Sequence, residues 1–175
     1  MDEFSRLTLA EMTRLADERR LPPVERWDPP HCGHSFMRIA RDGSWYHEGR
    51  PIRRPELVRL FASILRREPD GGYLLVTPAE KLTIDVEDAP FVAVEMRSEG
   101  EGRERALAFR LNTGEIVLAG PGHRLRLDGT RPYLEVRGRL DALIARAVWY
   151  ELAELALGEG GVWSGGAFFP IGGGA

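Results

Sequence analysis

Lysine is almost absent from this chain. All 24 of its basic residues are arginine except Lys81, in the stretch Val76-Thr77-Pro78-Ala79-Glu80-Lys81. A lysine offers a compact ammonium group whose pKa burial can lower, which a guanidinium does not. The retained lysine therefore predicts a specific contact, although a solvated lysine kept by chance would leave the same sequence.

Cysteine and long apolar runs are scarce as well. Cys32 is the only cysteine, which excludes an intramolecular disulfide. No uncharged apolar stretch is long enough for a membrane helix, and the acidic start Met1-Asp2-Glu3 lacks the pattern of a signal peptide. The net charge of -3 argues against binding to duplex nucleic acid or to a membrane surface. We expect a cytoplasmic protein, and the sequence leaves its oligomeric state open.

Motifs that specify a reaction are missing too. The chain has no Gly-x-x-x-x-Gly-Lys-[Ser/Thr] loop, no Gly-x-Ser-x-Gly elbow, and no serine or cysteine nucleophile with an evident base. The only cluster of metal-ligand types is His31, Cys32 and His34, without a second cluster at a suitable spacing. We therefore expect no metal or cofactor, and a binding protein rather than an enzyme.

The chain does contain a clear series of short elements. Residues 5–19 form an amphipathic pattern that predicts a helical arm, and residues 24–30 predict an extended connector. A hairpin is predicted at the Arg41-Asp42-Gly43 turn, followed by a helix whose apolar stripe ends at Leu65 and by a strand at 73–76. Short runs separated by turn residues predict strands at 82–86, 91–96, 106–111, 115–118, 124–127 and 133–136. An apolar stripe predicts a long helix over 140–155.

An internal repeat is visible in these elements. Asp42-Gly43 is followed by Gly49 at the same interval that separates Thr113-Gly114 from Gly120. The helix after each hairpin has the same apolar spacing, so residues 37–65 should superpose on residues 106–148. The alternative is that amphipathic helices look alike because they all share one period.

These patterns predict an α+β fold of two related β-hairpin/helix halves. Residues 1–30 form the arm and connector, 31–81 the first half, 82–157 the second half, and 158–175 a glycine-rich tail. Because Trp163 and Phe168 are too apolar for a solvated tail, we expect both to be buried against the body.

One polar constellation is a candidate binding site. A cation, an aromatic plane and a lysine together suit a small, planar anion such as a nucleotide, held in the cleft between the halves. The alternative is a surface network of ion pairs. The predicted ligand-binding residues are Arg38, Trp45, His47, Arg53, Thr77, Glu80, Lys81 and Asp88.

A series of motifs resembles a known bacterial family, the domain of unknown function 1285. These are Met37-Arg38-Ile39, Asp42-Gly43-Ser44-Trp45, Gly49-Arg50-Pro51-Ile52, Leu57-Val58-Arg59-Leu60-Phe61, Leu75-Val76-Thr77-Pro78-Ala79-Glu80-Lys81 and Val86-Glu87-Asp88-Ala89-Pro90-Phe91. Phe36, with His34 before it, departs from the acidic residues expected ahead of the Arg-Ile pair. The resemblance implies a duplicated core whose C-terminal half is a pleckstrin-homology-like β-barrel capped by a helix. It also implies a ligand at the domain interface and a role in signal transduction.

Two other functions stay open at this point. The first is a metal-dependent phosphate-ester hydrolase that uses Asp85, Glu87 or Asp88. The second is a protein-interaction module that binds partners through an edge strand.

Overall fold

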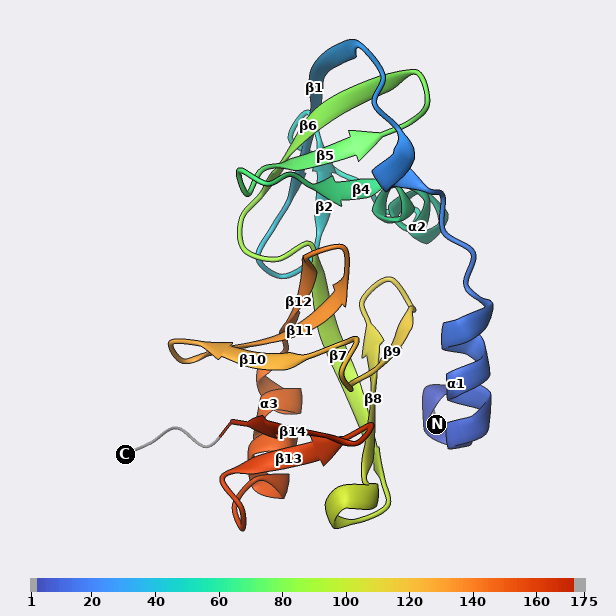
Figure 1. Cartoon of the computed structure of the whole chain (residues 1–175). Helices are drawn as coiled ribbons and strands as arrows, with labels where there is room; N and C mark the ends of the chain where they lie inside the picture. Colours follow the sequence, from blue (N-terminus) through green and yellow to red (C-terminus); the bar gives the residue numbers. More distant parts are fainter. Residues whose placement is uncertain (1–2, 172–175) are drawn as a thin grey trace. The chain divides into compact units, whose positions relative to one another are not determined.

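The computed structural model describes residues 3–171, which form two compact units (Figure 1). The N-terminal unit holds residues 20–90 together with 138–140, and the C-terminal unit holds residues 3–19, 91–137 and 141–171. Each unit contains a six-stranded sheet and at least one helix, which confirms the predicted α+β class. No helix within residues 3–171 is long and apolar enough to span a membrane.

The sheet of the N-terminal unit has the strand order β3-β2-β1-β6-β5-β4. Its central strands, β1 and β6, run parallel, and the other pairs are antiparallel. The helix α2 (Pro55–Ser63) connects β3 to β4, and the short 3-10 helix η2 (Val24–Arg26) lies in the connector. The strands are β1 (His31–Ile39), β2 (Trp45–His47), β3 (Arg50–Pro51), β4 (Leu65–Arg67), β5 (Tyr73–Val76) and β6 (Glu80–Val86).

Local sequence explains the first elements of this unit. The predicted hairpin between β1 and β2 is confirmed: Gly43 has a φ of 89°, and the Ser44 N–H donates to Oδ1 of Asp42 over 2.9 Å. Pro55 occupies the first turn of α2, where its missing N–H costs no hydrogen bond. The Phe61 ring of α2 stacks on Trp45 of β2 with 6.3 Å between centroids, so α2 covers this face of the sheet.

The end of α2 differs from the prediction. The helix ends at Ser63, and Leu65 begins β4, where it pairs with Leu75. Leu65 fits the apolar spacing of the helix, but a strand also buries its side chain. Its pairing with a neighbouring strand selects the strand over the helix.

The sheet of the C-terminal unit has the order β10-β11-β12-β7-β8-β9, with β12 parallel to β7. The 3-10 helix η3 (Gly102–Glu104) joins β7 to β8, and the helix α3 (Arg146–Leu155) follows β12. The strands are β7 (Phe91–Glu99), β8 (Ala106–Leu111), β9 (Ile116–Leu118), β10 (Leu125–Asp128), β11 (Arg131–Arg137) and β12 (Leu140–Ile144).

The two sheets repeat one topology. When the six strands of each sheet are counted along the chain, the order across both sheets is 3-2-1-6-5-4, and strands 1 and 6 run parallel. The predicted superposition of residues 37–65 on 106–148 is nevertheless wrong, because β1 corresponds to β7 and not to β8. The helices also differ in place, since α2 follows the third strand of its sheet and α3 follows the sixth.

Residues 140–144 form a strand and not the first turns of a long helix. Leu140, Ala142 and Ile144 are all buried, and this segment pairs in parallel with residues 91–93 of β7. Its apolar residues fit both the helical and the alternating period. The parallel partner, which is remote in sequence, selects the strand.

The tail forms a hairpin of β13 (Gly161–Ser164) and β14 (Ala167–Pro170), and residues 172–175 lie outside the described part. Ser164 Oγ accepts the Leu107 N–H over 2.9 Å and donates to the Ala119 carbonyl over 2.8 Å, which ties the hairpin to β8. The prediction for the aromatic pair is wrong for Phe168, which is 38% exposed, whereas Trp163 is half-buried. Strand alternation explains the exposure of Phe168, because successive residues of β14 point to opposite faces and Phe169 is the one that is buried.

The N-terminal arm packs on the edge of the C-terminal sheet. It consists of the 3-10 helix η1 (Glu3–Arg6) and the helix α1 (Leu9–Glu18), which lies along β9 (Figure 1). Thr8 and Glu11 form a capping box that begins α1. Phe4 and Met12 form a buried cluster with Ala108 of β8, so the arm covers an edge that would otherwise be open.

Candidate functional site

Two of the predicted ligand-binding residues, Trp45 and Arg38, make contacts with other residues of the N-terminal unit. Trp45 is only 2% exposed and stacks on Phe61, so its ring belongs to the core of the N-terminal unit. Arg38 donates to Oε1 of Glu87 over 2.6 Å and lies 4.4 Å above the centre of the Tyr46 ring. Its guanidinium thus already has a carboxylate and an aromatic partner.

Residues Thr77 and Glu80 shape the turn between β5 and β6. Oγ1 of Thr77 accepts the N–H groups of Ala79 and Glu80, both over 3.2 Å. The Glu80 carboxylate lies 3.8 Å from Nε2 of His31, its register partner on β1. Asp88 is half-buried in the segment after β6. These contacts are the ordinary ones of a turn and of neighbouring strands.

Lys81 contacts the connector. Its Nζ donates to Oδ1 of Asp28 over 2.7 Å. This hydrogen bond raises the pKa of Lys81 above its ordinary value and lowers the pKa of Asp28. Arg66 adds two hydrogen bonds to the same connector, to the carbonyls of Val24 and Trp27. The single lysine thus helps to fix residues 24–28, and a role in ligand binding stays a prediction.

His47 and Arg53 do come together, at a surface hollow of about 570 Å³ in the N-terminal unit. We call it the arginine hollow, because three of the side chains that line it are arginines. The lining residues are His47, Glu48, Arg50, Pro51, Ile52, Arg53, Arg54 and Leu57.

A tight turn and a helix start build the arginine hollow. Glu48 and Gly49 both have positive φ, of 50° and 79°, and reverse the chain so that Arg50 pairs with His47. The Ile52 N–H donates to the Trp45 carbonyl over 2.8 Å and holds the following segment beside β2. α2 then begins with Arg54 as its N-cap residue, which has no side-chain capping bond. The start of a helix also contributes partial positive charge.

The arginines of the hollow have no partner acids in the described part of the chain. Residues 3–171 contain no hydrogen bond or ion pair that engages the guanidinium of Arg50, Arg53 or Arg54. The only acidic side chain that lines the hollow is Glu48. Three positive charges against one negative charge leave a net excess of two, with ten or more N–H donors free for an anion.

Two arginines of the hollow, Arg50 and Arg54, were not predicted from the sequence. A signal was available, because three arginines occur within five positions, from Arg50 to Arg54, between Pro51 and Pro55. The segment has no strand or helix period, and so no pattern assigned a common direction to these side chains.

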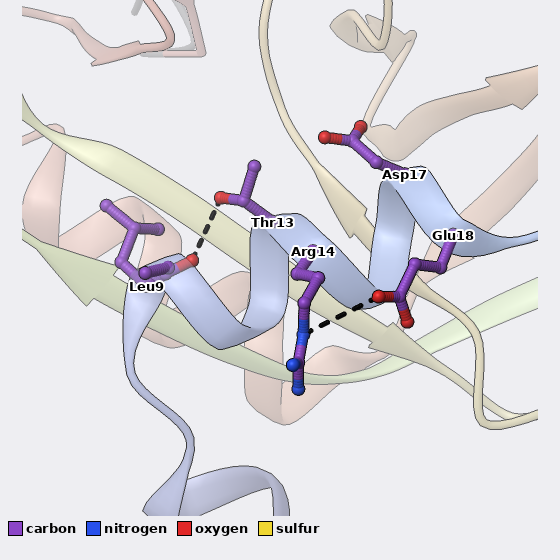
Figure 2. A pocket seen from close by; sticks show the side chains of 6 residues that line it. Leu9, Thr13, Arg14, Asp17 and Glu18 are labelled. Carbon is purple, nitrogen blue, oxygen red and sulfur yellow. Dashed lines mark hydrogen bonds and ion pairs between the residues drawn. The ribbon is translucent and has the colours of Figure 1, made fainter.

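A second hollow, of about 630 Å³, runs along α1 in the C-terminal unit (Figure 2). Three of its four polar side chains are already engaged, because Thr13 Oγ1 donates to the Leu9 carbonyl over 2.9 Å and Arg14 lies 3.7 Å from Glu18. The hollow is lined by Leu9, Ala10, Thr13, Arg14, Asp17 and Glu18, all from this one helix.

The other acidic residues do not form a metal centre in the described structure. Asp85 lies 4.0 Å from Nε2 of His34, and Glu87 binds Arg38. Within residues 3–171, no three His, Cys, Asp or Glu side chains are grouped so that they could hold a metal ion.

Fold and hollow together define a class: a two-part α+β protein with the same mixed sheet in each part and a basic hollow in the first. Two family models match the chain, the N-terminal domain of DUF1285 over residues 22–89 and the C-terminal domain over residues 90–171. The chain belongs to this family, a domain of unknown function, which confirms the resemblance seen in the sequence.

Two solved structures of the same family are similar to this chain. A DUF1285 family protein from Silicibacter pomeroyi DSS-3 is 44% identical, with a TM-score of 0.79 and 93% of each chain covered. A DUF1285 family protein from Shewanella baltica OS155 is 27% identical, with a TM-score of 0.57, covering 69% of this chain and 92% of that one. The search of curated proteins found no match.

Proposed function

We propose that this protein binds a small anionic ligand and that the arginine hollow holds the anionic group. The observation that carries the proposal is the set of three arginines without partner acids around one hollow. Like charges held close together destabilise a folded protein, and a bound anion removes that cost. Guanidinium groups also match the oxygen geometry of phosphate and carboxylate through paired hydrogen bonds.

A phosphate group fits the hollow better than a carboxylate. The net excess of two positive charges is neutralised by a dianion, whereas a carboxylate leaves one charge over. Pro51, Ile52 and Leu57 add an apolar part to the lining, against which the carbon skeleton of a phosphate ester can lie.

Further parts of the proposal rest on the family resemblance. These are a nucleotide-like ligand, a signalling role in the cytoplasm, and a pleckstrin-homology-like C-terminal half. Six strands followed by α3 support the last of these, although the parallel pair of β7 and β12 departs from an antiparallel barrel.

Titration calorimetry with inorganic phosphate tests the proposal. Arg53→Gln and Arg54→Gln each remove one guanidinium from the hollow. The matched control is Arg59→Gln, which removes an exposed arginine of α2 that does not line the hollow. Because the hollow is open to solvent, we expect a loss of about 1 kcal/mol per arginine, or about five-fold in affinity.

Phosphate affinity should also fall as salt is added, since the attraction between exposed charges is screened. Equal losses in Arg53→Gln and Arg59→Gln would show that binding depends on overall charge and not on the hollow. No detectable binding to the unmodified protein would overturn the proposal.

A further inference from the structure

Phe36 is an exposed aromatic residue in a strained conformation. Its side chain is 63% exposed, and its φ of 57° lies in the left-handed region that residues with a side chain rarely adopt. It lies at an irregularity of β1, where the register with β6 shifts between His34 and Arg38. Both features cost free energy, so the surrounding structure must hold them in place.

Four hydrogen bonds fix the backbone around Phe36. Ser35 Oγ donates to the Thr83 carbonyl over 2.7 Å and accepts the Met37 N–H over 3.1 Å. The Phe36 N–H donates to Nδ1 of His34 over 2.7 Å, and its carbonyl accepts the Glu48 N–H over 2.9 Å. The strained conformation is therefore held on both sides, by β6 and by the turn after β2.

The backbone hydrogen bond to Glu48 joins Phe36 to a residue that lines the arginine hollow. Glu48 lines the hollow and has a positive φ itself, so two strained residues are bonded to one another at its border. The His34 ring lies 4.9 Å from the Phe36 ring at an angle of 41°, which gives a surface of two aromatic rings. An aromatic surface one backbone contact away from a site for an anion suits a ligand that has both an anionic and an aromatic part.

We propose that Phe36 determines ligand specificity: the anion in the arginine hollow carries an aromatic group that stacks on the Phe36 ring. This inference rests on the proposed function of the hollow. The ligand class is a phosphate ester of an aromatic or heteroaromatic molecule, because stacking is satisfied by any flat ring. An exposed phenylalanine held in a strained conformation contributes little to the core, and the bound ring provides the apolar contact that it lacks.

Two esters with the same charged group distinguish the contribution of the aromatic ring to binding from that of the phosphate. Phenyl phosphate and methyl phosphate are each titrated into the unmodified full chain and into Phe36→Leu, which removes the aromatic ring but keeps an apolar side chain. Phe36→Tyr restores the ring. The matched control is Leu60→Ala, which alters another exposed apolar residue of the same unit, 56% exposed and outside the hollow.

We expect the unmodified protein to bind phenyl phosphate about ten-fold more tightly than methyl phosphate. This ratio should fall to about one in Phe36→Leu and persist in Phe36→Tyr and Leu60→Ala. In the unmodified protein, nuclear Overhauser contacts should join the protons of the bound phenyl group to the Phe36 ring, which keeps the test independent of how the variants fold.

The outcomes distinguish this inference from the function on which it rests. If both esters bind with equal affinity, or if the ratio survives in Phe36→Leu, the aromatic specificity is wrong and anion binding still stands. If neither ester binds the unmodified protein, both proposals are overturned.

Discussion

Glu115 joins the N-terminal arm to the C-terminal sheet. Its side chain is only 8% exposed, with Arg137 of β11 donating to Oε1 over 2.6 Å. Arg19, at the end of α1, lies 3.0 Å from Oε2, an ion-pair contact without hydrogen-bond geometry. Burial lowers the pKa of Arg19, and the attraction of Glu115 acts against this effect. The carboxylate therefore neutralises two partly buried cations.

Replacing Glu115 by alanine removes this carboxylate from both guanidinium groups. Removing one side of a buried ion pair costs about 3 to 5 kcal/mol. Because the Arg19 and Arg137 side chains retain 24% and 20% exposure, water can reach them, and the lower end of that range applies. We expect the free energy of unfolding to fall by about 3 kcal/mol, and by less in Glu115→Gln, which keeps a carbonyl acceptor.

Urea unfolding measures the loss of stability, and tryptic cleavage after Arg20 reports release of the arm. Cleavage should be faster in Glu115→Ala, since it follows the population of the opened arm. Glu101→Ala, at an exposed acid of the same unit, should stay within about 0.5 kcal/mol of the unmodified protein. A change of less than about 1 kcal/mol in Glu115→Ala, with unchanged cleavage, would refute the argument that Glu115 holds the arm.

The pair of Asp28 and Lys81 should make stability depend on pH at both extremes. The pKa of Asp28 is lowered from 3.8, so its contribution is present above that value and lost as pH falls through the lowered pKa. The pKa of Lys81 is raised from 10.5, so its contribution is present below 10.5 and lost as pH rises through the raised pKa. Melting temperatures of Asp28→Asn should vary less with pH in both ranges, and parallel curves for the two proteins would contradict the pairing. In the tail hairpin, Gly161→Ala would place a Cβ 2.6 Å from Phe168 Cζ and 2.9 Å from Pro170 Cα, and closer still to the Phe169 carbonyl. Thermal unfolding should show a loss of about 1 to 3 kcal/mol. Gly158→Ala, with nothing within 4 Å, is the control, and equal losses in the two variants would show that the close approach is unimportant.

Much of the C-terminal sheet could be predicted from sequence. The strand predicted at 106–111 is β8 to the residue, because a short apolar run bounded by turn residues is a local signal of the sequence. β12 could not be predicted in the same way. Leu140 and Ile144 fit a helix as well as a strand, and only the parallel pairing with β7 selects the strand.

The candidate site was predictable in part. Alternation placed Trp45 and His47 on one face of β2, but it could not show that Phe61 of α2 covers Trp45 and leaves His47 exposed. The turn at Glu48 and Gly49, which brings Arg50 back to His47, depends on positive φ values at both residues. A glutamate gives no signal of such a conformation in a sequence.

Locating a bound anion in the crystal tests the central claim most directly. Crystals of the full chain soaked in selenate, a phosphate-like dianion, can be examined by anomalous scattering from selenium. Our account predicts a selenium peak in the arginine hollow, within contact of the guanidinium groups of Arg50, Arg53 and Arg54. The peak should be lost in crystals of Arg53→Gln/Arg54→Gln and retained in crystals of Arg59→Gln. An empty hollow in the unmodified protein, with selenate bound elsewhere or not at all, would contradict the account.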